Sequence, residues 1–229
     1  NWQDFSILSN ETTRFIQPSS SSAVLNRVLG GNPSSILGSL SANGKVYLIN
    51  PNGIVVGSGA NINCNSFIAS TLDVKDVDFL RGGDLTFSGN STASIVNLGK
   101  ITASEGDVFL MARQVQNLGS IEAKQGNVGL AAGTEILLRD SGNEKVFVKA
   151  GAVTNGTGVD HQGVIDAIRT ELKSAGSVYS LAINAGGTIN ATQFQEVGGE
   201  VYLRAPGGKI KQTGIIHAQG TQQGGKVVV

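Results

Sequence analysis

Short alternations of apolar and polar residues recur along the chain as a two-part repeat. The first part reads Gly-x-apolar-x-Ala, the second reads Gly-x-Val-x-apolar, and the pair returns five times in the same order. Alternation with a period of two is typical of short β-strands with one buried face. The two most similar copies, 97–110 and 117–130, are offset by twenty positions. The first parts start at Gly38, Gly99, Gly119, Gly187 and Gly214, and the second parts start at Gly44, Gly106, Gly126, Gly199 and Gly225.

A repeat of about twenty residues with two or three strands predicts one rung of a solenoid, here a parallel β-helix. Successive rungs would stack at about 4.8 Å, so that Ile101 and Ile121 lie one above the other in a narrow core. The glycines between the strands are expected to form corners with positive φ. An antiparallel sandwich is the alternative, but a sandwich has no reason to repeat a two-strand unit in one order. We therefore predict an all-β chain folded as a parallel β-helix.

Asparagines fall at several of the expected corners and have two interpretations. They could stack as side-chain ladders from rung to rung, or turn propensity alone could place them there. Turn propensity is the simpler interpretation. The asparagines concerned are Asn97, Asn117, Asn184 and Asn190.

The segment 160–176 departs from the period of two. Asp160 suits a helix N-cap and Gly176 suits a helix stop, and the apolar residues between them form one stripe at helical spacing. We predict a single amphipathic helix that packs on the wall of the solenoid, with partner docking as the less favoured use. The charged piece 139–149 before it is expected to be a loop or hairpin. The apolar stripe comprises Val164, Ile165, Ile168 and Leu172.

Composition agrees with one β-helix domain over 1–229, interrupted by a loop and helix excursion at 140–177. The chain has 32 glycines and 5% aromatic residues, which argues against a thick globular core. Its 17 basic and 17 acidic residues give no net charge, so nothing favours nucleic acid or an anionic membrane surface. The single cysteine, Cys64, lies in an alternating stretch and is interpreted as a buried small hydrophobe. No run approaches the ~18 apolar residues of a membrane span.

Candidate chemistry is sparse. Asp73, Asp76 and Asp78 could bind Ca²⁺ or act as an acid/base pair, although a solvated loop is the favoured interpretation. The two histidines, His161 and His217, are not at metal-ligand spacing. Gly-Ser-Gly at 57–59 lacks the further glycine and lysine of a phosphate-binding loop. We therefore expect no catalytic residues, no cofactor and no metal.

The stretch 48–56 joins two apolar strands through a well-specified turn. Asn50 suits the first position of a β-turn, Pro51 presets φ at the second, and Gly53 releases the chain at the fourth. This turn is set among Asn-Arg-Val at 26–28, Asn-Pro-Ser-Ser-Ile-Leu-Gly at 32–38, and Phe-Ile-Ala-Ser-Thr-Leu-Asp at 67–73. Together these motifs closely resemble the secretion domain of two-partner-secretion exoproteins, the family of filamentous haemagglutinins and related adhesins of Gram-negative bacteria.

The resemblance implies a right-handed parallel β-helix that a dedicated outer-membrane transporter recognises through its periplasmic domains. It further implies a secreted, extracellular or cell-surface protein in which this domain leads an adhesin, haemolysin or matrix protein, with a host or glycan receptor bound by the downstream passenger. The candidate recognition or structural turn is Asn50, Pro51, Asn52, Gly53 and Ile54, and the secondary motif is Asn26, Arg27, Asn32 and Pro33.

Members of this family usually carry further residues before the Asn-Trp start, and these residues cap the helix. Bare terminal rungs would offer unpaired strand edges, so end-to-end self-association of this chain is a further expectation. Two alternative functions stay open at this point. One is a structural β-helix subunit that stacks into an extracellular filament or matrix, and the other is a glycan-active β-helix enzyme.

Overall fold

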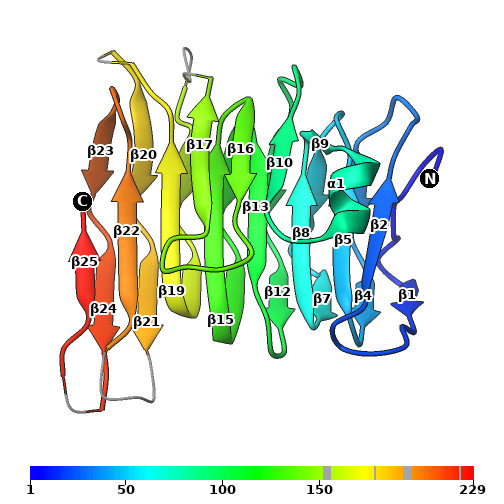
Figure 1. Cartoon of the computed structure of the whole chain (residues 1–229), viewed down its shortest axis with the longest axis horizontal. Coiled ribbons are helices and arrows are strands. Elements are labelled where there is room, and N and C mark those ends of the chain that lie inside the picture. Colours follow the sequence, from blue (N-terminus) through cyan, green and yellow to red (C-terminus); the bar gives the residue numbers. More distant parts are fainter. Residues whose placement is uncertain (152–155, 178, 193–197, 222) are drawn as a thin grey trace.

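The strands of the computed structural model stack as rungs along one long axis, with the N-terminus at one end and the C-terminus at the other (Figure 1). The structure describes residues 1–151, 156–177, 179–192, 198–221 and 223–229. Within these ranges, equivalent strands of successive rungs pair in parallel and form three faces around a common core. The predicted parallel β-helix is confirmed.

Each face is a ladder of parallel strands, and the long strands β15 and β19 bend from the first face into the second. The first face comprises β1 (Thr12–Phe15), β4 (Ser39–Ala42), β7 (Asn61–Cys64), β12 (Lys100–Ala103), β15 (Ser120–Ala132), β19 (Val164–Ser174), β21 (Thr188–Thr192) and β24 (Ile215–Gln219). The second comprises β2 (Ala23–Arg27), β5 (Lys45–Ile49), β8 (Ser66–Ser70), β13 (Val108–Ala112), the later halves of β15 and β19, β22 (Glu200–Arg204) and β25 (Lys226–Val228). The third comprises β3 (Ser34–Ile36), β6 (Ile54–Val56), β11 (Ser94–Asn97), β14 (Gln114–Asn117), β18 (Val159–His161), β20 (Leu181–Ala185) and β23 (Lys209–Gln212).

The core consists of columns of equivalent apolar side chains. On the first face, Ile101 pairs in register with Ile121, and the column continues in both directions through residues that are at most 1% exposed. Cys64 takes the place of the repeat alanine beside Ala103 and is fully buried, and burial raises the pKa of its thiol to about 12. The sequence interpretation of this cysteine as a small core residue is confirmed. The isoleucine column runs through Leu40, Ile62, Ile101, Ile121, Ile165 and Ile189.

The repeat glycines are needed for a different reason from the one predicted. None of the ten has a positive φ, so the expected left-handed corners are wrong at these positions. Successive corners instead pass so close together that a side chain has no room. A Cβ on Gly119 would lie 2.2 Å from the carbonyl oxygen of Gly99, and one on Gly126 would lie 2.0 Å from that of Gly106. Glycine is retained because backbone stacks directly on backbone.

The helix predicted over 160–176 is wrong. This segment forms β18 and β19, and Ile165 pairs in register with Ile121 on one side and Ile189 on the other. Gly163-x-Ile165-x-Ala167 is a sixth copy of the first repeat part. The second part of this repeat copy is not recognisable in the sequence, because the corner between the two parts is two residues shorter than in β15. One residue, Ile168, stands opposite the three residues 124–126 of β15, and the repeat glycine and valine are replaced. The predicted loop and helix excursion at 140–177 is therefore wrong in its second part, which belongs to the rungs of the β-helix. Residues 152–155 of the predicted excursion lie outside the described ranges.

An antiparallel sheet that the sequence analysis did not foresee covers part of the second face. It has the order β17 (Val146–Ala150), β16 (Glu135–Leu138), β10 (Leu85–Ser88) and β9 (Asp73–Val74). The segment 139–149, expected to be a loop or hairpin, comprises the β16–β17 connection at 139–145 and most of β17. The described ranges contain one helix, α1 (Asp76–Arg81), where a solvated loop had been predicted. A second hydrophobic core fills the space between this sheet and the β-helix, built on Phe87, Phe109 and Met111.

Buried polar side chains form a ladder inside the third face. Asn97 Nδ2 donates to Asn117 Oδ1 at 2.8 Å, and Asn117 Nδ2 lies 3.1 Å from His161 Nδ1. All three side chains are fully buried. The opposite ring nitrogen of His161 lies 3.2 Å from the carbonyl oxygen of Thr188, which requires that Nε2 carries the proton and Nδ1 accepts. At Asn97 and Asn117 the asparagines therefore form a side-chain ladder, rather than serving only as turn residues.

Candidate functional site

The turn at 50–53 is built around the side chain of Asn50, which is fully buried. Gly53 N donates to the Asn50 carbonyl oxygen at 3.1 Å and closes the turn, and Gly53 has a φ of 111°. Asn50 Oδ1 accepts from Asn52 N at 2.9 Å. Asn50 and Gly53 therefore serve the backbone geometry that their positions predicted.

The same side chain joins the two sequence motifs. Asn50 Nδ2 donates to the carbonyl oxygen of Asn32 and to Ser34 Oγ, both at 3.0 Å. Asn52 Nδ2 donates to the carbonyl oxygen of Gly30 at 2.7 Å. Residues 26–34 and 50–54 thus form one surface feature, which we name the motif corner.

Arg27 of the secondary motif anchors the segment that enters α1. Its Nε donates to Asp73 Oδ1 and its Nη2 lies against Asp76 Oδ1, each at 2.9 Å. Nη2 also donates to the carbonyl oxygen of Val74 at 2.8 Å. Asp73 and Asp76, weighed above as candidate acids, are therefore partners of one guanidinium. Asp78 instead pairs with Arg81 at 2.7 Å.

Asn26, the first residue of the secondary motif, is 2% exposed. Its Oδ1 accepts from Trp2 Nε1 at 3.0 Å and its Nδ2 donates to the carbonyl oxygen of Tyr47 at 3.3 Å. Asn26 therefore ties the first residues of the chain to strands β2 and β5, and its contacts are structural.

The motif corner divides into a buried support and an exposed surface. Asn26, Asn50, Gly53 and Ile54 are buried, and their contacts are internal. The exposed members are Leu29, Gly31, Asn32, Pro33, Pro51 and Asn52. Only the exposed members are available to a partner without local opening of the fold.

A surface hollow of about 210 Å³ lies beside the motif corner. Its walls are mainly apolar, with Arg27 and Asp73 at one side. It is lined by Arg27, Val28, Leu29, Ile49, Pro51, Thr71 and Asp73. The hollow therefore touches both sequence motifs and the end of the 67–73 stretch.

The other residues considered for chemistry do not converge on a site. His161 belongs to the buried polar ladder, and burial lowers its pKa, while His217 is exposed on β24. Across the described ranges, no group of three or more His, Cys, Asp or Glu side chains is placed to hold a metal ion. In the same part of the chain, no helix is long and apolar enough to cross a membrane.

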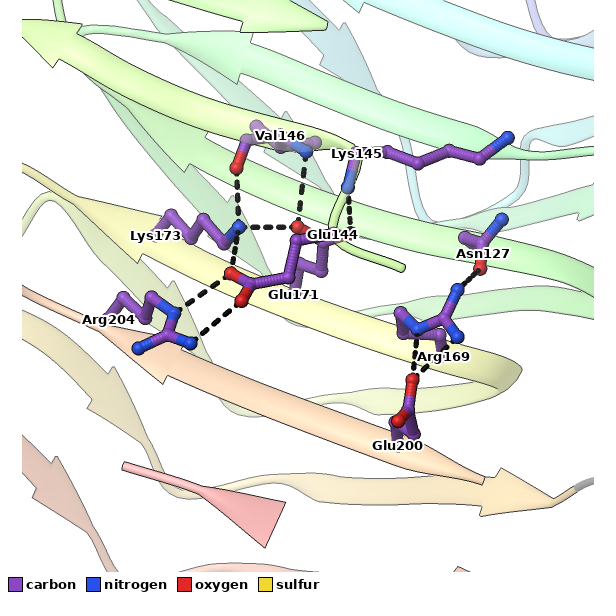
Figure 2. Close-up of polar contacts among 9 residues, drawn as sticks. All are labelled: Asn127, Glu144, Lys145, Val146, Arg169, Glu171, Lys173, Glu200 and Arg204. Carbon is purple, nitrogen blue, oxygen red and sulfur yellow. Dashed lines mark hydrogen bonds and ion pairs between the residues drawn. The ribbon is translucent and has the colours of Figure 1, made fainter. Parts of the chain in front are cut away.

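Sequence reasoning missed a buried charge cluster that holds β17 against the β-helix (Figure 2). Lys173 Nζ contacts Glu171 Oε2 at 2.6 Å and Glu144 Oε2 at 2.7 Å, and it donates to the carbonyl oxygen of Val146. Arg204 binds both oxygens of Glu144. The hydrogen bonds from Arg204, assisted by Lys173 and opposed by burial, lower the pKa of Glu144 to about 2. Charged residues at 171 and 173 indicate a polar outer face of the strand. Their partners at 144–146 are distant in sequence, so the sequence did not predict the ion pairs.

The comparisons with known proteins agree with the fold and the motifs. The sequence model of the TPS secretion domain matches residues 1–224. The chain belongs to the TPS secretion domain family. The HMW1 secretion domain of Haemophilus influenzae is similar over 99% of this chain and 65% of that chain, with 29% identity and a TM-score of 0.76. The filamentous haemagglutinin secretion domain, at 18% identity and a TM-score of 0.60, covers 91% of this chain and 75% of that chain and supports the fold.

A curated relative, the heme/hemopexin-binding protein of Haemophilus influenzae strain Rd, is 40% identical over 108 residues, which is 47% of this chain and 11% of the relative. TPS secretion domains belong to exported exoproteins and engage an outer-membrane transporter of the TpsB type. This chain is accordingly a secretion-directing domain, and it reaches the extracellular side or the cell surface across the outer membrane. The family is one of secretion domains rather than enzymes.

Proposed function

We propose that this chain directs export by presenting the motif corner to the periplasmic domains of its outer-membrane transporter. The observation that carries the proposal is the joining of two separate motifs by Asn50, whose buried amide bonds to Asn32 and Ser34. The side chains of Asn32, Pro33, Pro51 and Asn52 are exposed around this anchor. A surface held rigid by buried hydrogen bonds loses little conformational entropy when a partner binds, which favours specific recognition.

The clearest test uses Asn52→Ala, because this side chain is exposed and has few internal contacts. The variant loses the hydrogen bonds from Nδ2 to the carbonyl oxygen of Gly30 and to Asn50 Oδ1, so it should fold with a small loss of stability. We expect its affinity for the purified periplasmic domains to fall at least about fivefold, the equivalent of one contact worth ~1 kcal/mol. Titration calorimetry with these domains, and secreted yield from cells, are the two measurements.

Asn43→Ala is the matched control. Asn43 is also an exposed corner asparagine, and it exchanges two hydrogen bonds of 2.7 Å with the backbone of Gln17. It lies outside the motif corner, so its variant should bind the transporter domains as the parent does. Equal affinities for the parent, Asn52→Ala and Asn43→Ala would rule out recognition through the corner.

Asn50→Ala probes the support rather than the contact surface. The change removes both bonds from Nδ2 and leaves the fully buried Ser34 hydroxyl without that donor. A buried polar group that loses its partner costs about 1–3 kcal/mol, so we expect a loss of roughly 3 kcal/mol in the free energy of unfolding. We expect less of this variant to be exported, because a smaller fraction of it is folded. Urea unfolding measures the loss, and a change below ~0.5 kcal/mol would contradict the anchoring role.

We further infer that the domain acts without catalysis, and that adhesion belongs to the exoprotein that it leads. Heme or hemopexin binding is the property named for the curated relative, of which the match spans 11%. Asp76→Asn combined with Asp78→Asn should leave transporter binding intact, because these exposed or partly exposed carboxylates serve internal ion pairs and do not line the hollow beside the motif corner. Hydrolytic or lyase activity on acidic polysaccharides that disappears in this double variant would refute the non-catalytic function.

A further inference from the structure

Exposed leucines line up along the corner where the third face turns into the first. At this corner each main-chain N atom donates to a carbonyl oxygen of the preceding rung, so the corner residues stand one above another. These bonds, of 2.7 or 2.8 Å, run from Leu37 to Ile7, from Gly57 to Ile36, from Leu98 to Val56 and from Leu118 to Asn97. Leu8 follows Ile7 and opens the series. We name Leu8, Leu37, Leu98 and Leu118 the leucine stripe, and they are 57%, 39%, 42% and 48% exposed.

The leucine stripe is continuous over the first rungs and then stops. Gly57 stands between Leu37 and Leu98, but a Cβ on Gly57 would lie 2.7 Å from Leu37 Cδ2, so the Leu37 side chain extends over this gap. In the later rungs the equivalent positions hold Gln162, Gly186 and Thr213. The corner geometry therefore does not require leucine. Single exposed apolar side chains are ordinary on a protein surface, whereas a contiguous line of them marks an interaction site.

The leucine stripe lies on the same strands as the motif corner. Strand β3 begins after Pro33 and is followed by Leu37, and strand β6 begins after Gly53 and is followed by Gly57. Each of these strands has three residues, so only roughly 10 Å separates the motif corner from the stripe. The outward side chains between them, Ser35 and Val55, pair in register and are partly exposed. The motif corner and the stripe are therefore two ends of one continuous surface.

The third face beside the stripe is uncharged. Strands β3, β6, β11 and β14 contain no Asp, Glu, Lys or Arg, so a partner meets no charge here that it must pair or desolvate. Four half-exposed leucines cover much less than the ~800 Å² that each partner buries in a standard interface. The stripe alone is thus too small for a stable dimer of this chain. Its size fits the flank of a larger contact, and the surface that it adjoins is the motif corner.

We propose that the leucine stripe docks an uncharged, apolar surface of the periplasmic domains of the transporter, next to the contact at the motif corner. A transporter of the TpsB type is the partner that TPS secretion domains engage. This inference rests on the proposed function, because it extends the same contact across the third face. The two ends of the surface differ in chemistry. The corner offers amides that select a partner by directional hydrogen bonds, and the stripe offers apolar area whose burial adds affinity.

The test replaces two leucines of the stripe together, as Leu98→Ala with Leu118→Ala. The control is Val164→Ala with Ile215→Ala, because these residues are 39% and 56% exposed on the first face, outside the stripe. Both double variants should fold with melting temperatures close to that of the parent, since they shorten exposed side chains. We expect only the stripe variant to bind the purified periplasmic domains more weakly, by about tenfold for two leucines that no longer bury their side chains. Titration calorimetry measures the affinity, and secreted yield through the intact transporter should fall in parallel.

The outcomes separate this inference from the proposed function. Unchanged binding of the stripe variant, alongside weakened binding of Asn52→Ala, would overturn the docking of the stripe and leave the proposed function standing. Equal weakening by the stripe variant and its control would also overturn it. Sedimentation of the parent over a range of concentrations tests a second copy as the occupant. A dimer that the stripe variant abolishes, with the affinity for the periplasmic domains unchanged, would assign the stripe to contacts between copies. If neither the stripe variant nor Asn52→Ala weakens binding, both proposals are refuted.

Discussion

Lys173→Met tests whether the buried charge cluster fastens the antiparallel sheet to the β-helix. The side chain of Lys173 is 4% exposed and that of Glu171 is fully buried (Figure 2). Methionine keeps the apolar stem and removes the ammonium. Glu171 then retains its bonds from the backbone N atoms of Lys145 and Val146, at 2.7 and 3.1 Å, but loses its counter-charge.

The expected magnitude follows from that unpaired carboxylate. Removal of one partner from a buried ion pair costs about 3–5 kcal/mol, whereas replacement of both partners by uncharged groups is often close to neutral. Lys173→Met should therefore cost roughly 3 kcal/mol, because the two backbone donors still stabilise Glu171. Adding Glu171→Gln should restore much of this loss, since the amide oxygen still accepts a backbone hydrogen bond and no buried charge remains.

Urea unfolding followed by circular dichroism measures the free energies, and limited proteolysis reports local release of the segment 139–150. Lys124→Met is the control, because Lys124 pairs with Glu122 at 3.0 Å on an exposed surface and should contribute nothing measurable. Equal stabilities of Lys173→Met and Lys124→Met would refute the fastening role. So would a double variant that is no more stable than the single variant.

Three further outcomes are expected. Burial lowers the pKa of His161, so this histidine takes up a proton at a higher pH in the unfolded state than in the folded state. The free energy of unfolding should therefore fall by at most about 1.4 kcal/mol between pH 6.5 and 5.5. In pH-dependent urea unfolding, His217→Asn should keep this loss and His161→Asn should remove it. Gly126→Ala should lose about 2–3 kcal/mol, because its Cβ would overlap a carbonyl oxygen, while Gly59→Ala, with no atom within 4 Å, should be neutral or slightly stabilising in the same assay. Cys64, buried with a pKa raised to about 12, should resist iodoacetamide in the native state and react after unfolding, which mass spectrometry can follow; rapid native labelling would contradict its core position.

The sequence was sufficient for the β-helix because each rung repeats local information. Glycine at the corner and an isoleucine two residues later recur at most strands of the first face, as at Gly99 and Ile101. Where the corner shortens, the same information is lost. Around Ile168 the repeat glycine is absent, and the remaining apolar spacing fits a helix as well as two strands. The register with the neighbouring rungs decides between them, and that register is a tertiary property.

The antiparallel sheet could not be predicted because its strands lie far apart in sequence. Phe87 pairs with Val74 on one side and Ile136 on the other, and no short-range signal links these segments. The motif corner was partly predictable. Asn50 and Gly53 were expected as turn residues, but the bonds from Asn50 to the 32–34 segment depend on how two rungs stack. The leucine stripe was not predicted, because Leu37 and Leu98 come close only through the stacking of rungs.

The offset of twenty residues between Ile101 and Ile121 is the shortest in the isoleucine column, so it sets the minimum length of chain that each new rung takes up during export. Twenty residues of extended chain span roughly 65 Å, yet a completed rung adds only about 4.8 Å along the axis. A bilayer with its headgroups is about 40 Å thick. One rung that forms outside the cell therefore takes up a longer stretch of extended chain than the stretch that spans the membrane. The rung is thus the natural unit in which outward movement becomes hard to reverse, because backward slippage first requires a whole rung to unfold.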